Sequence, residues 1–352
     1  MTRTILMLPG DGIGPEVAAA AKLCLQAAAS AHGLDLAFDE APFGGAAIDA
    51  CGAPLPEETL AKAKAADAIF LGAVGGPAWD DAPERPEKGL LGLRKALGLF
   101  ANLRPVKVFE GLEHLSPLKE DRVAGADVLI VRELTGGLYF GEKREGAAEA
   151  FDGCAYTAGE VERIARVAFA AAAGRKGRLT SVDKANVLAT SRLWRRTVDR
   201  LAPDFAGVSV DHMYVDAAAM ALVTGPSRFD VILTENLFGD ILSDEAAVIA
   251  GSIGLLGSAS LGESGPGLFE PIHGSAPDIA GKGVANPAGA IMSAAMLLRH
   301  GLGEPAAADR LEAALEAELK DGDRTADLGG AASTTAFAER VAERAARVRA
   351  AA

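Results

Sequence analysis

The chain has 352 residues, of which 49% are hydrophobic, enough to bury the core of one large or two ordinary domains. Its formal net charge of -13 and the lack of a basic tract exclude a nucleic-acid-binding function. No apolar run reaches the roughly 20 residues of a membrane span, and the first residues have too short an apolar stretch for a signal peptide. The three scattered cysteines predict neither a disulfide framework nor a thiolate metal site. We therefore expect a globular, cytoplasmic protein.

Short apolar segments alternate with longer helical segments along the chain. This alternation predicts an α/β fold with a largely parallel sheet. Two stretches rich in Gly and Pro, residues 72–89 and 251–267, are predicted to be long loops that could form walls of a site. The predicted strands are residues 4–8, 68–71, 128–131, 179–182 and 231–234, and the predicted helices are 16–31, 160–173, 192–201 and most of 288–352 apart from a break at 321–334.

The segment Gly10-Asp11-Gly12-Ile13-Gly14 lies between the first predicted strand and the first predicted helix. This position invites a dinucleotide-binding interpretation, but the G-x-G-x-x-G pattern requires a glycine where this chain has Pro15. A tight turn that leads into a helix with proline in its first turn explains the segment without a ligand. We interpret it as a structural turn.

Two aspartates, Asp240 and Asp244, follow the predicted strand 231–234 and are four residues apart. At the start of a helix this spacing places both carboxylates on the same face, where they repel each other unless a cation lies between them. Carboxylate oxygens are the ligands that Mg²⁺ and Mn²⁺ prefer. The alternative is that both are helix N-terminal acids favoured by the helix dipole and by capping.

Several charged or aromatic side chains lie near the ends of predicted elements. Arg94, Arg104 and Arg132 could each bind a carboxylate through two hydrogen bonds, although single arginines are more often surface or ion-pair residues. Lys184 follows the predicted strand 179–182, at a position that often borders ligands, and could act as a base if its surroundings favour the neutral amine. Tyr139 lies in a glycine-rich segment and is otherwise explained as a packed tyrosine.

The segment from His273 to Asn286 is too rich in Gly, Pro and polar residues to belong to the core. We predict a loop built around a ligand. Asp278 could accept hydrogen bonds from ribose hydroxyl groups, as acidic residues do at NAD sites. Lys282 is the nearest basic group and keeps NADP as an alternative.

Together these segments resemble the β-decarboxylating dehydrogenase family, whose members act on isopropylmalate, isocitrate, homoisocitrate or tartrate. The resemblance covers nearly the whole chain. It implies a two-domain α/β/α fold of the isocitrate/isopropylmalate dehydrogenase type, not a Rossmann fold, with the site in a cleft between the domains. The expected first domain is residues 1–99 with 252–352 and binds NAD, and the expected second is residues 100–251 and carries the metal and substrate residues and a dimer interface. The motifs are LPGDGIGPE, GLLGLRK, FANLRPVKVF, VLIVRELTGGLYFG, SVDKANVL, LFGDILSD, SASLG and FEPIHGSAPDIAGKGVANP.

The resemblance also implies an activity. We expect NAD- and Mg²⁺- or Mn²⁺-dependent oxidative decarboxylation of 3-isopropylmalate to 4-methyl-2-oxopentanoate and CO₂, a step of leucine biosynthesis. The apolar pair Leu90-Leu91 before Arg94 suits an isopropyl group, since each buried methylene contributes about 0.8 kcal/mol. Arg85 keeps homoisocitrate as an alternative, and isocitrate, tartrate and malate are others of the same family. A metal-dependent lyase that does not use NAD is an alternative of a different class.

Finally, the resemblance implies roles for individual residues. Lys184 would remove the hydroxyl proton and Tyr139 would protonate the enolate that forms on loss of CO₂. In such enzymes the lysine and one metal-ligating aspartate come from the partner subunit, so an obligate homodimer with shared active sites is expected. The implied substrate residues are Leu90, Arg94, Arg104, Arg132, Asn186 and Asp216; the metal ligands are Asp216, Asp240 and Asp244; and the NAD residues are Val74, Gly75, Gly76, Glu87, His273, Gly274, Ser275, Ala276, Asp278, Ala285 and Asn286.

Overall fold

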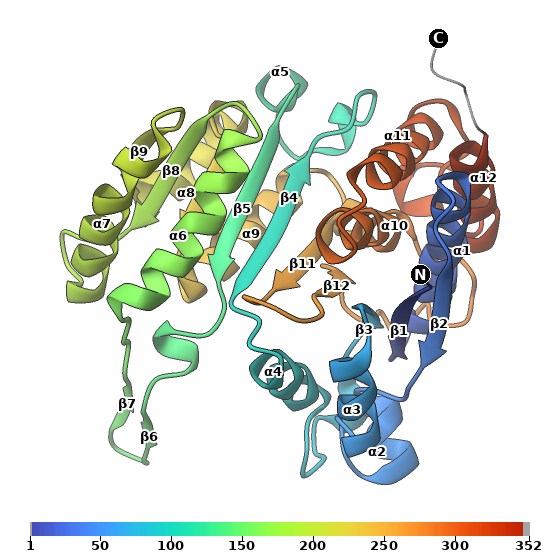
Figure 1. The fold of residues 1–352 in the computed structure, drawn as a ribbon, viewed down its shortest axis with the longest axis horizontal. Coiled ribbons are helices and arrows are strands. Elements are labelled where there is room, and N and C mark those ends of the chain that lie inside the picture. Colours follow the sequence, from blue (N-terminus) through green and yellow to red (C-terminus); the bar gives the residue numbers. More distant parts are fainter. Residues whose placement is uncertain (1, 348–352) are drawn as a thin grey trace. The chain divides into compact units, whose positions relative to one another are not determined.

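The computed structural model describes residues 2–347, and the chain divides into two compact units (Figure 1). Unit 1 consists of Met1–Leu99 and Ser252–Ala352, the two ends of the chain, and unit 2 consists of Phe100–Gly251. The last few residues of the helix predicted at the C-terminal end lie outside the described residues. Each unit has its own sheet strands and its own covering helices.

The strands of unit 1 follow the order β2-β1-β3-β12-β11. Strands β2, β1, β3 and β12 run parallel, and β11 pairs with β12 in the antiparallel direction. The central strand β3 is buried along its whole length, as expected for a strand covered on both faces. The strand bounds are β1 Arg3–Gly10, β2 Leu36–Glu40, β3 Ala68–Ala73, β11 Gly257–Leu261 and β12 Leu268–Pro271.

The longest helices of unit 1 are rich in alanine, which lets them pack closely. Helix α1 packs against α12 and α10, and the Cys24 thiol of α1 donates a hydrogen bond to the Ala338 carbonyl of α12 at 3.3 Å. Burial raises the pKa of the Cys24 thiol to about 12, so it is an inert core residue. The helices of this unit are α1 Gly14–Ala31, α2 Gly45–Cys51, α3 Glu57–Ala65, α4 Pro86–Ala96, α10 Ala288–Met296, α11 Pro305–Asp321 and α12 Thr334–Ala346.

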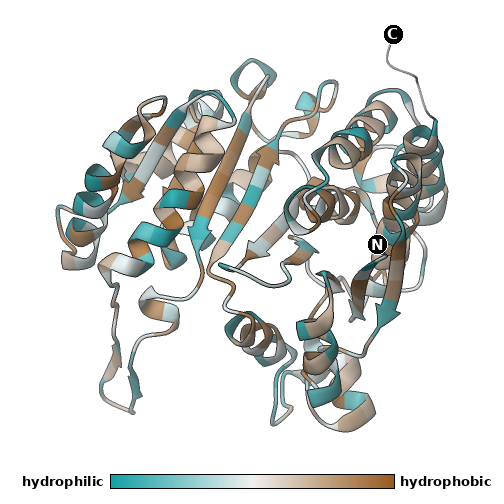
Figure 2. Cartoon of the chain, in the orientation of Figure 1, coloured by the Kyte–Doolittle hydropathy of each residue, from teal (hydrophilic) through white to brown (hydrophobic). Residues whose placement is uncertain are grey.

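The strands of unit 2 follow the order β4-β5-β10-β8-β9, in which only β4 is antiparallel to its neighbour. Helix α6 packs against β5, β8 and β10, and α9 packs against β5 on the other face, so this unit has three layers (Figure 1). Hydrophobic residues concentrate on the strands (Figure 2). The bounds are β4 Ala101–Lys107, β5 Asp127–Glu133, β8 Arg178–Asp183, β9 Ser209–Tyr214, β10 Val231–Thr234, α5 Glu120–Val123, α6 Ala158–Ala173, α7 Ala189–Leu201, α8 Val215–Thr224 and α9 Asn236–Ile249.

A two-stranded hairpin, β6 Lys143–Glu145 and β7 Ala150–Asp152, extends from unit 2 (Figure 1). All six residues of its two strands are exposed. An isolated two-stranded hairpin is at best marginally stable in water, so this segment would gain from a surface to pack on.

The sequence predictions hold for every strand and helix named from periodicity, but both predicted long loops are partly wrong. The loop at residues 72–89 ends where α4 begins at Pro86, because proline suits the first turn of a helix. The loop at residues 251–267 contains strand β11. The small residues of β11 suggest a loop, but here they are required for packing. A Cβ built on Gly257 would lie 2.7 Å from the Ser293 nitrogen of α10.

Candidate functional site

Arg132 lies at the end of β5, beside Thr234 of β10, and α9 begins two residues after that neighbour. The side chain therefore reaches the first turn of α9. It is 5% exposed, and its Nε and Nη2 atoms donate to the Asn236 side-chain oxygen at 3.2 and 2.8 Å while Nη1 contacts the Asp240 carboxylate. A Cβ built on Gly239 would lie 2.6 Å from the Arg132 Cγ, so this turn of α9 needs glycine. The guanidinium is held rigidly beside Asp240.

Arg104 projects from β4 toward the same helix. Its Nε donates to the side-chain oxygen of Asn102, two residues earlier on the same strand face, at 2.8 Å. Its Nη1 donates to the Ser243 hydroxyl at 2.6 Å and to the Asp244 carboxylate at 3.2 Å, and Nη2 lies 4.0 Å from Asp240. One guanidinium thus reaches both aspartates, which confirms that they lie on the same face of α9.

Tyr139 belongs to the short 3₁₀ turn Gly137–Tyr139 and completes this cluster. Its hydroxyl donates to Asp240 Oδ2 at 2.5 Å, and the Arg132 guanidinium lies 5.6 Å from the ring centre. Burial, reinforced by the Asp240 carboxylate, raises the pKa of Tyr139, so the phenol keeps its proton. Burial opposes ionisation of Asp240, but the charge of Arg132 and the Tyr139 hydrogen bond outweigh it and lower the pKa of Asp240.

Lys184 and Asp216 form a second, separate pair in unit 2. Lys184 follows β8 directly, its backbone N–H donates to the Ser191 hydroxyl at 3.0 Å, and its ammonium group contacts Asp216 in the first turn of α8. The hydrogen bond from the Lys184 ammonium group lowers the pKa of Asp216. Asn186, two residues beyond Lys184, is exposed. Within the part of the chain that the structure describes, Lys184 and Asp216 contact each other and form no hydrogen bond or ion pair with the Asp240 cluster.

The predicted metal ligands therefore fall into two groups within one chain. Asp240 and Asp244 offer hard carboxylate oxygens on one helix face, the donor type that suits Mg²⁺ or Mn²⁺. Among residues 2–347 of a single chain, no three His, Cys, Asp or Glu residues are placed to hold a metal ion together. The Asp240 and Asp244 pair fits one half of a divalent-cation site, and Asp216 is part of the other group.

Arg94 and Leu90 are the predicted substrate residues of unit 1, and Arg94 carries the charge. It lies in the last turn of α4, and its Nη2 pairs with Glu270 of β12 at 2.8 Å, both side chains being mostly buried. Leu90, one turn earlier, is partly buried against the core of unit 1, whereas Leu91 is 42% exposed. The apolar pair Leu90-Leu91 is thus divided between core and surface.

The predicted NAD segment at residues 273–286 of unit 1 is a loop with open glycines. His273 Nδ1 contacts the Gly274 carbonyl at 2.9 Å, while its Nε2 is buried and has no partner within residues 2–347. Burial lowers the pKa of His273, so the ring is neutral near pH 7. A Cβ built on Gly274 would meet nothing within 4 Å. An unpartnered ring nitrogen beside open main chain fits the edge of a cofactor site.

The remaining members of this loop differ in burial. Ala276 has a positive φ of 38°, a conformation that costs energy for a non-glycine residue and is often found at ligand sites. Asp278 is exposed, Ala285 is buried and accepts a hydrogen bond from the Thr334 hydroxyl at 2.6 Å, and Asn286 accepts from the Ala288 N–H at 3.0 Å where α10 begins. Asp278 is therefore the accessible polar group of this set.

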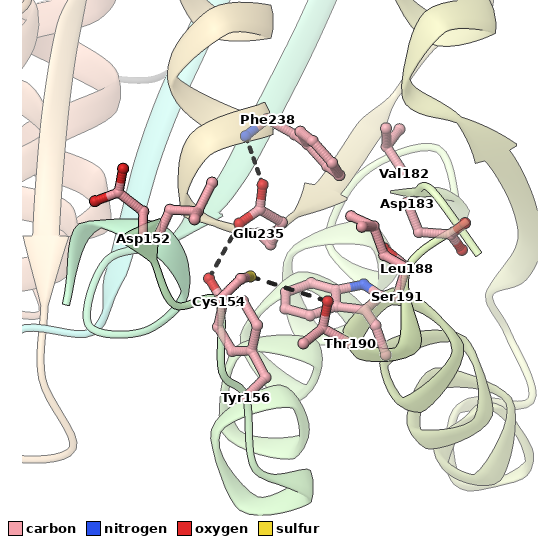
Figure 3. Close-up of a pocket in the computed structure, with 12 residues that line it drawn as sticks. Asp152, Cys154, Tyr156, Val182, Asp183, Leu188, Thr190, Ser191, Glu235 and Phe238 are labelled. Atoms are coloured by element: carbon pink, nitrogen blue, oxygen red, sulfur yellow. Dashed lines mark hydrogen bonds between the residues drawn. The ribbon is translucent and has the colours of Figure 1, made fainter. Parts of the chain in front are cut away.

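A mainly apolar cavity of about 260 Å³ lies elsewhere in unit 2 (Figure 3). At its wall the Glu235 carboxylate accepts hydrogen bonds from the Phe238 N–H at 2.8 Å and from the Tyr156 hydroxyl at 3.3 Å. Burial raises the pKa of Glu235 and also that of Cys154, whose thiol lies 3.9 Å from the Thr190 hydroxyl. None of the residues predicted for catalysis lines this cavity.

The sequence reasoning missed the residues that hold the three arginines. Asn236 and Asn102 could have been suspected, since each lies within a few residues of a predicted site residue at a strand end. Glu270 is part of the motif FEPIHGSAPDIAGKGVANP, but nothing in the sequence links it to Arg94, which lies 176 residues away. Ser243 lies between the two aspartates and was not singled out.

Comparison with known proteins identifies the family of this chain. The sequence model of isocitrate/isopropylmalate dehydrogenases matches residues 4–341. The chain belongs to the isocitrate/isopropylmalate dehydrogenase family. It is 56% identical over 351 residues to the 3-isopropylmalate dehydrogenase of Anaeromyxobacter dehalogenans, covering 98% of this chain and 99% of that protein. It is 58% identical over 331 residues to the enzyme of the same name from Synechococcus sp. strain CC9605, covering 92% and 93%.

Solved structures agree with this placement. The isocitrate dehydrogenase of Methylococcus capsulatus is 38% identical, with a TM-score of 0.87 over 98% of this chain and 100% of that one. A β-decarboxylating dehydrogenase of Thermococcus kodakarensis is 40% identical, with a TM-score of 0.82 over 97% and 96%. The predicted family and fold class are confirmed, and a dehydrogenase is favoured over a lyase. In residues 2–347 no helix has the length and apolarity to span a membrane.

Proposed function

We propose that this chain oxidises and decarboxylates 3-isopropylmalate to 4-methyl-2-oxopentanoate and CO₂, with NAD as the hydride acceptor. The observation that carries the proposal is the convergence of Arg104, Arg132 and Tyr139 on Asp240 and Asp244. It supplies cations for an anionic substrate, a proton donor and metal-type ligands in one place. High identity to enzymes named for this substrate supports it over most of the chain's length.

The predicted site residues divide the chemistry between them. Arg104 and Arg132 would bind the carboxylates of the malate, and Arg94 is proposed as a third ligand. Lys184 would accept the proton of the substrate hydroxyl group as the hydride leaves the same carbon. The resulting ketone is β to a carboxylate, which leaves as CO₂, and Tyr139 would donate its proton to the carbon left behind. The Tyr139 hydroxyl already donates a hydrogen bond to Asp240, which places its proton beside the proposed cation ligand.

Two bound groups complete the site. A divalent cation would be held by Asp240 and Asp244 with Asp216 as third ligand, and it supplies Lewis-acid stabilisation of negative charge on the substrate oxygens. NAD would be held by the loops at residues 74–87 and 273–286 and supplies the hydride acceptor. Asp278, exposed in the second loop, would accept hydrogen bonds from the ribose hydroxyls, which favours NAD over NADP.

A homodimer with shared sites is part of the proposal. It accounts for the separation of Asp216 and Lys184 from the Asp240 cluster within one chain, since the partner subunit would supply them. Helices α8 and α9 pack on each other and still expose Met220, Val223, Ile241 and Val248, an apolar surface of the kind that a second copy covers. The exposed β6–β7 hairpin is a further candidate contact.

The test is a comparison of 3-isopropylmalate with homoisocitrate, isocitrate, malate and tartrate, each with Mg²⁺ or Mn²⁺ and with NAD or NADP. Reduced-nicotinamide absorbance should appear fastest with 3-isopropylmalate and NAD. Removal of the cation with EDTA should stop it, and added Mn²⁺ should restore it. CO₂ release without reduced nicotinamide would overturn the proposal, and preference for homoisocitrate would replace its substrate.

Mixing of subunits tests the shared site. Lys184→Ala and Asp244→Ala chains should each be inactive as homodimers. A mixed dimer has one site with both residues intact, so random exchange should restore about a quarter of the wild-type activity. Mixed dimers that form, as seen by mass spectrometry, and show no activity would contradict the shared site.

A further inference from the structure

The turn between β1 and α1 has contacts that the proposed chemistry does not use. Gly10 and Gly12 have positive φ values of 71° and 58°, and Pro15 lies in the first turn of α1, so the structural interpretation of this segment holds. A Cβ built on Gly10 would lie 1.9 Å from the Ala73 carbonyl oxygen, which ties the turn to the end of β3. The first predicted NAD segment begins at the next residue, Val74.

Asp11 binds that segment directly. Asp11 is only 3% exposed. Its Oδ2 accepts hydrogen bonds from the N–H groups of Gly45 and Gly75 at 2.9 and 2.8 Å, and its Oδ1 accepts one from the N–H of Ala46 at 2.8 Å. Among residues 2–347, no Lys, Arg or His side chain pairs with this carboxylate. A buried carboxylate needs such donors to offset the loss of hydration, so the three bonds tie the main chain of residue 75 and the start of α2 to one side chain.

The second NAD segment is held from the same turn. The Ile13 N–H donates to the Ser275 carbonyl at 2.8 Å, and a Cβ built on Gly12 would lie 2.0 Å from that oxygen. One helical turn later, Glu16 Oε2 accepts the Gly283 N–H at 3.0 Å. Its other oxygen, Oε1, is buried and has no partner within residues 2–347.

The two segments also approach each other above this turn. A Cβ built on Gly76 would lie 3.6 Å from the Ser275 hydroxyl oxygen, and one built on Gly75 would lie 2.5 Å from Glu87 Oε1. Residues of both predicted NAD segments are therefore neighbours, and each is bound to one acidic side chain of the turn. Asp11 and Glu16 thus each accept a main-chain N–H group from one of the two segments.

We propose that Asp11 and Glu16 are positioning residues of the cofactor site, Asp11 for the segment at Gly75 and Glu16 for the segment at Gly283. The proposal rests on the proposed function, which assigns NAD to these segments. Neither side chain takes part in the reaction. Each holds main chain that would contact the cofactor, so each affects NAD binding more than binding of the malate.

Site-specific variants separate this role from general stability. The test set is Asp11→Ala, Glu16→Ala, the conservative Asp11→Asn and Glu16→Gln, and Asp67→Ala as a matched control. Asp67 accepts the Thr4 N–H at 2.7 Å near the opposite end of β1, so its removal also costs a carboxylate to main-chain bond. Hydrogen exchange of the full-length protein reports on peptides around residues 75 and 283, and calorimetry measures NAD binding without turnover.

Asp11→Ala should speed exchange around residues 45 and 75 but not around 283. Glu16→Ala should speed exchange around residue 283 but not around 45 and 75. Each should weaken NAD binding roughly tenfold while KM for 3-isopropylmalate changes less than about twofold, and the conservative variants should recover most of the affinity, as expected for lost acceptor oxygens. Asp67→Ala should change neither the exchange at these two segments nor the affinity for NAD. Equal loosening of both segments, or unchanged NAD affinity in a variant whose segment is loosened, would overturn the inference. Failure of the proposed function would be seen in the wild-type protein, as absence of NAD binding or turnover.

Discussion

The predicted substrate and metal residues of unit 2 are held by other side chains, whereas the predicted cofactor residues of unit 1 are held by their main chain. In unit 2 Arg132 is bonded to Asn236 and Asp240. In unit 1 Asp11 is bonded to three main-chain N–H groups, and Ser275 is held by its own carbonyl. We therefore expect substitution of these site residues of unit 2 to alter charge at the reacting atoms, and substitution of Asp11 in unit 1 to alter loop position.

The largest effect is expected for Arg132. Arg132→Ala should lower kcat/KM for 3-isopropylmalate by about 1000-fold, since removal of one partner of a buried, hydrogen-bonded charge pair costs about 4 kcal/mol. Arg132→Lys should recover little, because an ammonium group cannot form the planar fork that Arg132 makes with Asn236. NAD affinity measured by calorimetry should change little. If NAD binding fell in proportion, the contrast between the units would be wrong.

Arg175 provides the matched control. It pairs with the buried Asp230 at 2.8 Å and with Asp127 at the opposite end of β5, so like Arg132 it is bound to carboxylates, but its side chain is 24% exposed against 6% for Arg132. Arg175→Lys should lower the free energy of unfolding and leave the kinetic constants of the folded protein near wild type. A large kinetic effect here would mean that kinetics respond to any lost ion pair in this unit.

The sequence predicted more of the fold than of the contacts within the site. Periodicity identified the strands and main helices, but the small residues of β11 suggested a loop, because close packing on α10 is a tertiary requirement. The resemblance named Arg132 and Asp240, yet not Asn236, which is 104 residues from Arg132. Asp11 was interpreted as part of a turn, since its three N–H partners come from segments far along the chain. Such partners depend on the folded arrangement and leave no local pattern.

A smaller and more selective effect is expected for Tyr139. Tyr139→Phe removes the hydroxyl that donates to Asp240 and, in the proposed reaction, the proton donor. General acids contribute about 100-fold or more, so exchange of the C3 hydrogens of 4-methyl-2-oxopentanoate with D₂O should fall by about that factor. Stopped-flow formation of reduced nicotinamide should fall by less than about tenfold. Equal loss of both steps would assign Tyr139 to holding Asp240 instead.

The smallest effect is expected at Glu235, which tests whether a buried carboxylate of unit 2 can be changed without altering chemistry. Burial raises its pKa in the folded protein above the ordinary value of 4.5, despite the Phe238 N–H and Tyr156 hydroxyl bonds. Between those two values the folded state binds more protons than the unfolded state, so this group's contribution to stability is present below pH 4.5 and is lost as pH rises through the folded pKa. Glu235→Gln keeps an oxygen for the Phe238 N–H but cannot ionise.

The free energy of unfolding can be measured by urea titration. The value for Glu235→Gln minus that for the wild type should therefore increase as pH rises from about 5 to 8. Asp67→Asn is the control, because the Thr4 N–H lowers the pKa of Asp67 below 3.8, so Asp67 is ionised in both states throughout this range. Its difference from wild type should not depend on pH. Parallel wild-type and Glu235→Gln curves would show that the hydrogen bonds to Glu235 fully offset its burial. Turnover by Glu235→Gln close to wild type would place the carboxylate, like Arg175, outside the chemistry of unit 2.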